Sequence, residues 1–314
     1  MNRSLKIVFL GSPDFAVASL KALVENGQNI VGVVTAPDKP AGRGQKIQET
    51  AVKQYAVQQG LKVLQPSNLK ASDFIEELKA LNADLQIVVA FRMLPEVVWN
   101  MPRLGTFNLH ASLLPQYRGA APINWAIING EKETGVSTFF LQHAIDTGDL
   151  ILQEKTAIGE SMSAGELHDK LMNIGANLVV KTVELITIGK IESTPQKQIL
   201  GNELKIAPKL YKDLGRIDWQ ESIDRIHNIV RGLSPYPAAW TELNGKTIKI
   251  YKGQKEISSH EEQFGAIFSD GKKFLKVAVN GGFYIIEELQ IEGKKRMDID
   301  SFLSGYQQSM ECFK

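Results

Sequence analysis

Residues 106–122, TFNLHASLLPQYRGAAP, contain the end of a strand and the loop that follows it, and this transition decides the fold class. TFNLH has the pattern of a strand over residues 106–110, whereas SLLP and RGAAP break both the two-residue and the 3.6-residue periods. Asn108 and His110 are two residues apart, so both face one side of this strand near its carboxyl end. Ligands of open α/β sheets bind beyond the carboxyl ends of the strands, so we expect this amide and this imidazole to face a cleft.

The two side chains suit chemistry at a carbonyl carbon. Asn108 can donate an N–H to a developing oxyanion, and His110 can take or give a proton near neutral pH. Asp146 lies in an Asp-Thr-Gly turn after a second predicted strand at residues 136–141, where it could hold His110 in one tautomer and stabilise its charged form. Spacing alone leaves the alternative open, because a histidine near a strand end is more often structural and Asp in such a turn is usually only a turn residue.

Strands and helices alternate along the first half of the chain, which predicts an α/β fold with a doubly wound, mostly parallel sheet. Apolar runs typical of buried parallel strands occur at residues 5–10 and 85–90, and further strands are predicted at 30–34 and 62–64. Helices are predicted at residues 14–26, at 50–59, after a Ser72 cap, and at 123–129. The first strand and helix are joined by GSP without a G-x-G-x-x-G fingerprint, so this unit does not favour NAD binding.

The composition is that of an ordinary globular protein of about two domains, with 314 residues, 43% hydrophobic and 23% charged. The 36 Lys and Arg residues nearly balance the 35 Asp and Glu residues, so a nucleic-acid partner would be held by local basic patches. Cys312 is the one cysteine, which excludes an intrachain disulfide and a thiolate metal cluster. The apolar run in MNRSLKIVFLGSP is too short for a signal peptide, and no run reaches the roughly 18 residues of a membrane helix. We therefore expect a cytoplasmic protein.

A basic loop, APDKPAGRGQK, occupies residues 36–46, after the strand predicted at 30–34. Its prolines and glycines exclude a helix or a central strand and expose Lys39, Arg43 and Lys46 to solvent. Such a loop could be an ordinary mobile surface loop. It could equally contact the phosphates of a polynucleotide, since Lys and Arg supply affinity without sequence information.

The C-terminal third has a different pattern. A long helix is predicted at residues 163–186, with Ser163 and Glu166 as a capping box. The polar, aperiodic residues 190–207 are predicted to be a linker between a catalytic domain at 1–189 and a second domain at 208–314. Short strands separated by Gly and Asn turns predict a small OB-like β-barrel in the second domain, which could bind an oligonucleotide or serve as a structural or dimerisation module.

Several motifs resemble one family. NLHxSLLPxYRGxxP followed by DTGD resembles the signature of the formyltransferases that use 10-formyltetrahydrofolate, which have a Rossmann-like catalytic domain. FLGSPDFAVASLKAL, TAPDKPAGRGQK, KLYKDLGRIDW and RGLSPYPAAW resemble the members that act on methionyl-tRNA, so the likeness covers nearly the whole chain. The resemblance implies that Asn108, His110 and Asp146 are catalytic, and that the protein transfers a formyl group to the α-amino group of methionine on initiator tRNA.

The resemblance also implies which molecules are bound. The formyl donor would be 10-formyltetrahydrofolate, no metal would be needed, and neither a membrane nor an obligate protein partner is implied. The tRNA contacts would be Lys39, Arg43 and Lys46, with Arg43 matching an Arg of the family's inserted loop that enters the tRNA acceptor arm. Lys209 matches a family lysine implicated in substrate use.

Two segments would bind the folate by the same resemblance. The first consists of Ser112, Leu113, Leu114 and Pro115, which would contact it through backbone and apolar atoms. The second consists of Phe91, Arg92 and Met93. Here AFRMLP departs from the family pattern, which has a Tyr-Gly pair and one more residue before Leu-Pro, and this departure affects the expected shape of the pocket.

Three alternatives remain. The acceptor could be glycinamide ribonucleotide or a sugar nucleotide, although relatives with those acceptors lack a segment like KLYKDLGRIDW. The protein could bind RNA through the barrel and the basic loop without catalysis. It could also be a nicotinamide oxidoreductase, which the missing fingerprint disfavours.

Overall fold

The computed structural model describes residues 4–41, 46–199, 203–306 and 308–313. The chain forms two compact units, each drawn from several parts of the sequence. Unit 1 consists of Met1–Gly119, Gly135–Thr156 and His168–Ile206. Unit 2 consists of Ala120–Thr134, Ala157–Leu167 and Ala207–Lys314.

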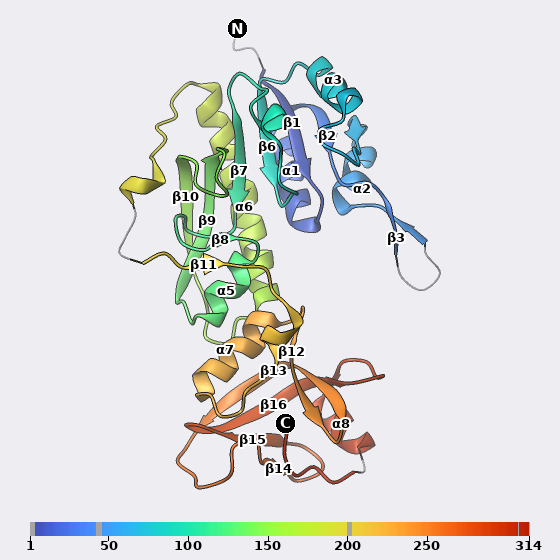
Figure 1. Ribbon diagram of the computed structural model, residues 1–314, viewed down its shortest axis with the longest axis vertical. Coiled ribbons are helices and arrows are strands. Elements are labelled where there is room, and N and C mark those ends of the chain that lie inside the picture. Colours follow the sequence, from blue (N-terminus) through green and yellow to red (C-terminus); the bar gives the residue numbers. More distant parts are fainter. Residues whose placement is uncertain (1–3, 42–45, 200–202, 307, 314) are drawn as a thin grey trace. The chain divides into compact units, whose positions relative to one another are not determined.

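The sheet of unit 1 confirms the predicted α/β class. Seven strands follow the order β10-β9-β7-β6-β1-β2-β5 (Figure 1). Their bounds are β1 Lys6–Gly11, β2 Asn29–Val34, β5 Val63–Leu64, β6 Leu85–Val89, β7 Thr106–His110, β9 Glu133–Phe140 and β10 Leu150–Ala157. The first five of these pair in parallel, whereas β9 runs antiparallel to β7. The carboxyl ends of β6 and β7 therefore lie side by side at one edge of the sheet.

Helices lie on both faces of this sheet. Their bounds are α1 Asp14–Glu25, α2 Ala51–Gln58, α3 Ser72–Ala80, α4 Glu96–Trp99 and α6 Ala164–Thr187. Gly175 of α6 lies so close to β7 that a Cβ there would be 2.7 Å from the Leu109 side chain. On the opposite face, Phe74 and Leu78 of α3 belong to the same buried cluster as Val88 of β6. Asn108 pairs in register with Val88, so it faces away from α6.

The two predicted N-caps have different outcomes. The capping box before α6 is confirmed, because the Glu166 N–H donates to Ser163 Oγ at 3.3 Å and Glu166 Oε2 accepts the Ser163 N–H at 2.8 Å. The Ser72 cap is wrong, since Ser72 is the first residue of α3 and Ala71 occupies the cap position without a side-chain hydrogen bond. The first-turn N–H of Phe74 donates to the Asp73 carboxylate instead.

The basic loop begins and ends as a hairpin, with β3 Lys39–Ala41 pairing antiparallel with β4 Lys46–Gln48. Figure 1 shows β3 running outward from the sheet. Asp38 anchors the base of the hairpin, because it accepts a hydrogen bond from Gln65 Nε2 at 2.7 Å and pairs with Lys53. Both partners hold the pKa of the Asp38 carboxyl below its usual value, Lys53 more strongly.

Unit 2 contains the antiparallel sheet expected for the C-terminal third. Its strands follow the order β12-β13-β16-β15-β14, and β17 pairs with β16. The bounds are β12 Ala239–Leu243, β13 Lys246–Ile257, β14 Ile267–Ser269, β15 Leu275–Val279, β16 Gly282–Ile291, β17 Met297–Asp298 and α8 Ile299–Gly305. Helix α5 (Pro122–Ile128) packs against α7 (Ile223–Leu233), where a Cβ at Gly232 would lie 2.7 Å from Ile128.

Short elements complete the described chain: β8 Arg118–Gly119, η1 Gln196–Gln198, β11 Ile206–Ala207 and η2 Lys212–Gly215.

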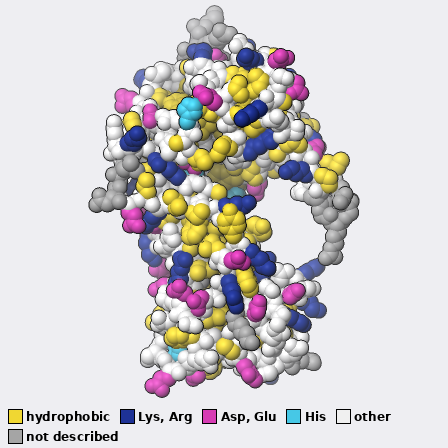
Figure 2. Space-filling model, viewed as in Figure 1, with side chains coloured by type: hydrophobic (Ala, Val, Ile, Leu, Met, Phe, Trp, Pro, Cys, Tyr) yellow, Lys and Arg dark blue, Asp and Glu magenta, His cyan; other side chains and the backbone are white. Residues whose placement is uncertain are grey.

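None of the helices in the described ranges combines the length and the apolar character needed to cross a bilayer. On the face drawn in Figure 2, Lys and Arg side chains are interspersed with Asp and Glu, as the balanced charge of the sequence suggests.

Candidate active site

Asn108 and His110 are the third-last and last residues of β7, as predicted. Both belong to the strand face opposite α6, and β7 is flanked by β6 and β9. His110 is buried, with 7% of its surface exposed, whereas Asn108 is half-buried. The Asn108 carboxamide makes no hydrogen bond to any other residue that the structure describes, so its N–H groups are available to a ligand.

The two ring nitrogens of His110 have different surroundings. Nε2 lies 2.9 Å from the carbonyl oxygen of Tyr117. A carbonyl can only accept, so Nε2 carries a proton. Nδ1 lies 3.9 Å from Asp146 Oδ2, which is too long for a hydrogen bond but close enough to stabilise a protonated ring. The Tyr117 carbonyl therefore selects the tautomer, a role that the sequence suggested for Asp146.

Asp146 is held in its turn by backbone contacts. Its Oδ2 accepts the Gly119 N–H at 3.0 Å, which aims the carboxylate at the loop after β7. Its φ of 53° lies in the left-handed region, which Asp tolerates better than most residues. Two residues later, a Cβ on Gly148 would lie 1.6 Å from the Phe140 carbonyl oxygen, so only glycine fits where the turn meets the end of β9.

The SLLP segment is fixed from inside the protein. Ser137 Oγ donates to the Ser112 carbonyl at 2.6 Å and accepts the Leu114 N–H at 3.1 Å. Ser112, Leu114 and Pro115 are buried, and Leu113 is half-buried. Of these four predicted folate contacts, only Leu113 thus has an accessible side chain, and the other three can contribute through backbone.

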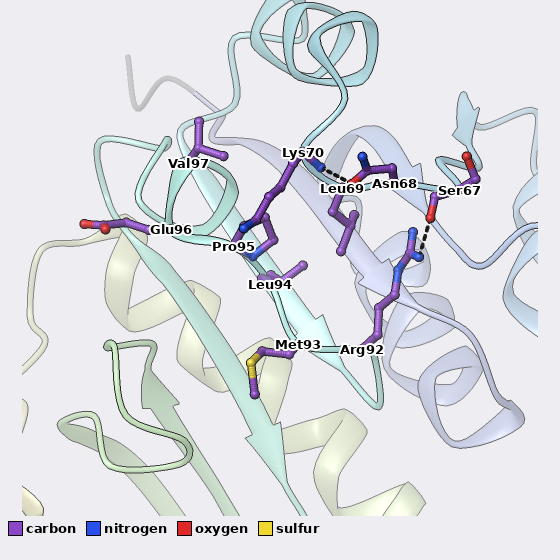
Figure 3. A pocket seen from close by; sticks show the side chains of 10 residues that line it. All are labelled: Ser67, Asn68, Leu69, Lys70, Arg92, Met93, Leu94, Pro95, Glu96 and Val97. Atoms are coloured by element: carbon purple, nitrogen blue, oxygen red, sulfur yellow. Dashed lines mark hydrogen bonds between the residues drawn. The ribbon is translucent and has the colours of Figure 1, made fainter.

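A pocket of about 680 Å³ lies beside the predicted second folate segment, lined by residues 67–70 and 92–97 (Figure 3). Arg92 Nη1 donates to the Ser67 carbonyl at 2.9 Å, which joins the two lining segments. Met93 is 72% exposed, and Phe91 is half-buried beneath the Arg92 guanidinium. Residues 92–97 follow β6, the parallel neighbour of β7, so the pocket and His110 lie at the same edge of the sheet.

The predicted tRNA contacts are placed only in part. Lys39 is exposed at the start of β3. Arg43 lies outside the described residues, and for Lys46 only the backbone, in β4, is described. Lys209 belongs to unit 2, where it is exposed and its Nζ lies 6.0 Å from the centre of the Tyr211 ring. Within the described ranges, no three His, Cys, Asp or Glu side chains are grouped to bind a metal ion.

Two contacts at this site were not predicted. One is the Tyr117 carbonyl, which any residue type could supply. The other is Gln196, whose side chain accepts hydrogen bonds from Arg118 and donates to the carbonyl of Asp146. Burial lowers the pKa of the Arg118 guanidinium, and the charge of Asp146 opposes this effect.

Known proteins resemble the chain over nearly its whole length. A family model described as formyl transferase matches residues 5–183, and one described as formyl transferase, C-terminal domain, matches residues 209–307. The chain is 58% identical over 318 residues to a methionyl-tRNA formyltransferase of Parabacteroides distasonis, with 99% of this chain and 98% of the relative covered. It is 54% identical to a methionyl-tRNA formyltransferase of Flavobacterium johnsoniae, with 96% of each covered. An N-formyltransferase from Helicobacter canadensis, solved with folinic acid and dTDP-3-aminofucose, shares the fold with a TM-score of 0.65 at 20% identity, over 90% of this chain and 98% of that chain.

Proposed function

Because the chain belongs to the formyl transferase family, we propose that it transfers the formyl group of 10-formyltetrahydrofolate to the α-amino group of methionine on initiator tRNA. The product, N-formylmethionyl-tRNA, serves the initiation of protein synthesis. The observation that carries the proposal is the 58% identity to a methionyl-tRNA formyltransferase over 99% of this chain. A role in translation agrees with a cytoplasmic location, which we propose with it.

Three side chains carry out the transfer in this proposal. The amine attacks the formyl carbon, and the carbonyl oxygen becomes an oxyanion that Asn108 stabilises with its uncommitted N–H groups. His110 accepts the proton released by the amine at Nδ1, because Nε2 already donates to the Tyr117 carbonyl. The carboxylate of Asp146, 3.9 Å away, stabilises the protonated ring. His110 then returns the proton to the folate nitrogen as the carbon–nitrogen bond breaks.

The substrates would occupy distinct regions of the chain. The folate binds at the sheet edge in the pocket of residues 67–70 and 92–97, together with Phe91 and the backbone of residues 112–115. The tRNA contacts Lys39, Arg43 and Lys46 of the hairpin. It also contacts Lys209, which belongs to unit 2. We keep the predicted division into a catalytic domain at 1–189, a linker at 190–207 and a tRNA-binding domain at 208–314 as a functional one. The compact units differ from it, because unit 2 includes residues 120–134 and 157–167 and unit 1 includes residues 190–206.

Incubation with 10-formyltetrahydrofolate and charged initiator tRNA tests the function directly. We expect N-formylmethionyl-tRNA, detected after mild hydrolysis of the ester. An amino-sugar nucleotide, offered in place of the tRNA, serves as the control acceptor. We expect no formylated product from it. Formylation of the sugar without formylation of the tRNA would overturn the proposal, and so would RNA binding without any transfer.

The role of the hairpin is tested separately with Arg43→Ala. A phosphate contact supplies affinity and no chemistry, so we expect a higher KM for tRNA with unchanged KM for the folate. Glu49→Ala, on the same segment but of opposite charge, is the control. Equal tRNA kinetics in the wild type and Arg43→Ala would make the hairpin a simple connector.

A further inference from the structure

Gln196 is a buried, fully hydrogen-bonded side chain near the candidate site. It lies in the segment between α6 and β11 and is 2% exposed. Its Oε1 accepts from Arg118 Nε at 3.1 Å and from Arg118 Nη2 at 2.5 Å. Its Nε2 donates to the carbonyl oxygens of Asp146 at 2.9 Å and Gly148 at 2.8 Å. A carboxamide has two donors and two acceptor sites, so all four are used.

The backbone beside Gln196 is itself fixed. Thr194, two residues earlier, forms a bridge to Leu150 at the start of β10, with the two N–H···O distances at 2.8 and 2.9 Å. Gln196 opens the 3-10 turn η1, and its two neighbours in that turn, Lys197 and Gln198, are exposed. The buried carboxamide is thus presented to the site from a backbone anchored on the main sheet.

The bonds from Nε2 hold the turn that carries the candidate catalytic carboxylate. Asp146 has a left-handed φ of 53°, which costs a non-glycine residue some strain even where Asp tolerates it better than most, so contacts that hold the turn matter. Gln196 binds the carbonyls on both sides of Thr147, which fixes the direction of the Asp146 side chain toward Gly119 and His110.

The hydrogen bonds to Oε1 hold Arg118, a cation that could otherwise pair with the Asp146 carboxylate. Arg118 is near enough to Asp146 for their charges to interact, yet the described ion pairs include none between them. Its guanidinium donates to a neutral amide oxygen instead. If that acceptor were lost, Arg118 could pair instead with the Asp146 carboxylate, whose charge already acts on it.

We propose that Gln196 is a positioning residue for the formyl transfer: it keeps Arg118 off the Asp146 carboxylate and fixes the turn that aims this carboxylate at His110. This role rests on the proposed function, since it acts through Asp146 and His110. The neutral amide suits it because a glutamate here would keep the contact to Arg118 but would lose both donors to the turn.

Gln196→Met tests the role, because methionine has a similar volume and none of the hydrogen bonds. We expect kcat to fall about 10- to 100-fold, because a misplacement of about 1 Å at a catalytic group can cost about 10²-fold, while KM for folate and for tRNA stay near their wild-type values. The acidic limb of the plot of kcat against pH moves to lower pH, because a carboxylate paired with Arg118 stabilises protonated His110 less. Gln198→Met, in the same turn but exposed, is the control and leaves both readouts unchanged.

The double variant Gln196→Met with Arg118→Met separates positioning from a general structural role. With no guanidinium left to pair with Asp146, the acidic limb returns to its wild-type position even if kcat stays low. The inference is overturned if the acidic limb of the pH profile stays displaced in the double variant. It is also overturned if that limb does not move in Gln196→Met. A wild-type protein that forms no N-formylmethionyl-tRNA contradicts the proposed function itself, which is a distinct result.

Discussion

Replacing Asn108 by alanine should separate catalysis from stability. The Asn108 carboxamide is half-buried and makes no hydrogen bond within the described parts of the chain, so its removal breaks no hydrogen bond that supports the fold. We expect the free energy of unfolding to change by less than about 0.5 kcal/mol. Losing one oxyanion donor typically raises the barrier by about 2.7 to 4 kcal/mol, which lowers kcat about 10²- to 10³-fold.

Thr106→Val is the matched control, because Thr106 is on the same face of β7, two residues earlier. Its hydroxyl is buried and donates to the Trp99 carbonyl at 2.6 Å. Valine keeps the volume but leaves this carbonyl without its donor, which should cost about 1 to 3 kcal/mol of unfolding free energy. We expect kcat to remain at the wild-type value, since no atom of Thr106 is assigned to the reaction.

Two measurements decide the outcome. Single-turnover formylation of charged initiator tRNA reports the chemical step, and denaturant unfolding reports stability. The reasoning predicts opposite profiles for the two variants: Asn108→Ala slow but stable, Thr106→Val fast but less stable. Near-normal turnover in Asn108→Ala would remove this carboxamide from the mechanism.

Three further changes have distinct expected results. Asp146→Asn keeps an acceptor for the Gly119 N–H but removes the charge facing His110, so single-turnover rates should fall at least about 10²-fold with the folate KM unchanged; equal rates would show that the charge is not used. Gly148→Ala places a Cβ against the Phe140 carbonyl and should lower the unfolding free energy by about 1 to 3 kcal/mol, measured in urea; an unaffected midpoint would mean that the turn can relax. Burial lowers the pKa of His227 below its ordinary value of 6.5, so the unfolded chain binds the proton more readily than the folded chain. The stability that this group contributes is therefore lost as pH falls below 6.5. Thermal melts of the wild type and His227→Gln between pH 8 and 5 should diverge only at the acidic end.

The fold was predictable where its determinants are local. Apolar runs bounded by glycine and proline mark the strands, and Ser163 with Glu166 three residues later formed the capping box that its spacing indicates. Ser72 shows the limit of the same rule, because a competing acceptor at Asp73 took the N–H that a cap would have bound. Choosing between two adjacent polar residues at a helix start requires the backbone geometry.

The candidate site was predictable to the extent that it lies on one strand. Asn108 and His110 share a face because any residues i and i+2 of a strand do. The partner of His110 at Nε2 is a backbone carbonyl, which every residue type has, so the sequence could not identify it. Gln196 is 78 residues from Arg118 and 50 from Asp146, in a polar stretch predicted as a linker, so no local pattern could connect them.

Unit 2 takes residues 120–134 from the middle of the chain and completes its core with residues 207–314. Helix α5 contacts α7 there, with Asn124 Nδ2 donating to the Gly232 carbonyl at 2.8 Å. During synthesis on the ribosome, α5 must therefore emerge well before the helix on which it packs, and its apolar side stays uncovered in the meantime. Recombination that exchanged only the C-terminal stretch between relatives would part these two helices, so a working hybrid would have to inherit both from one parent.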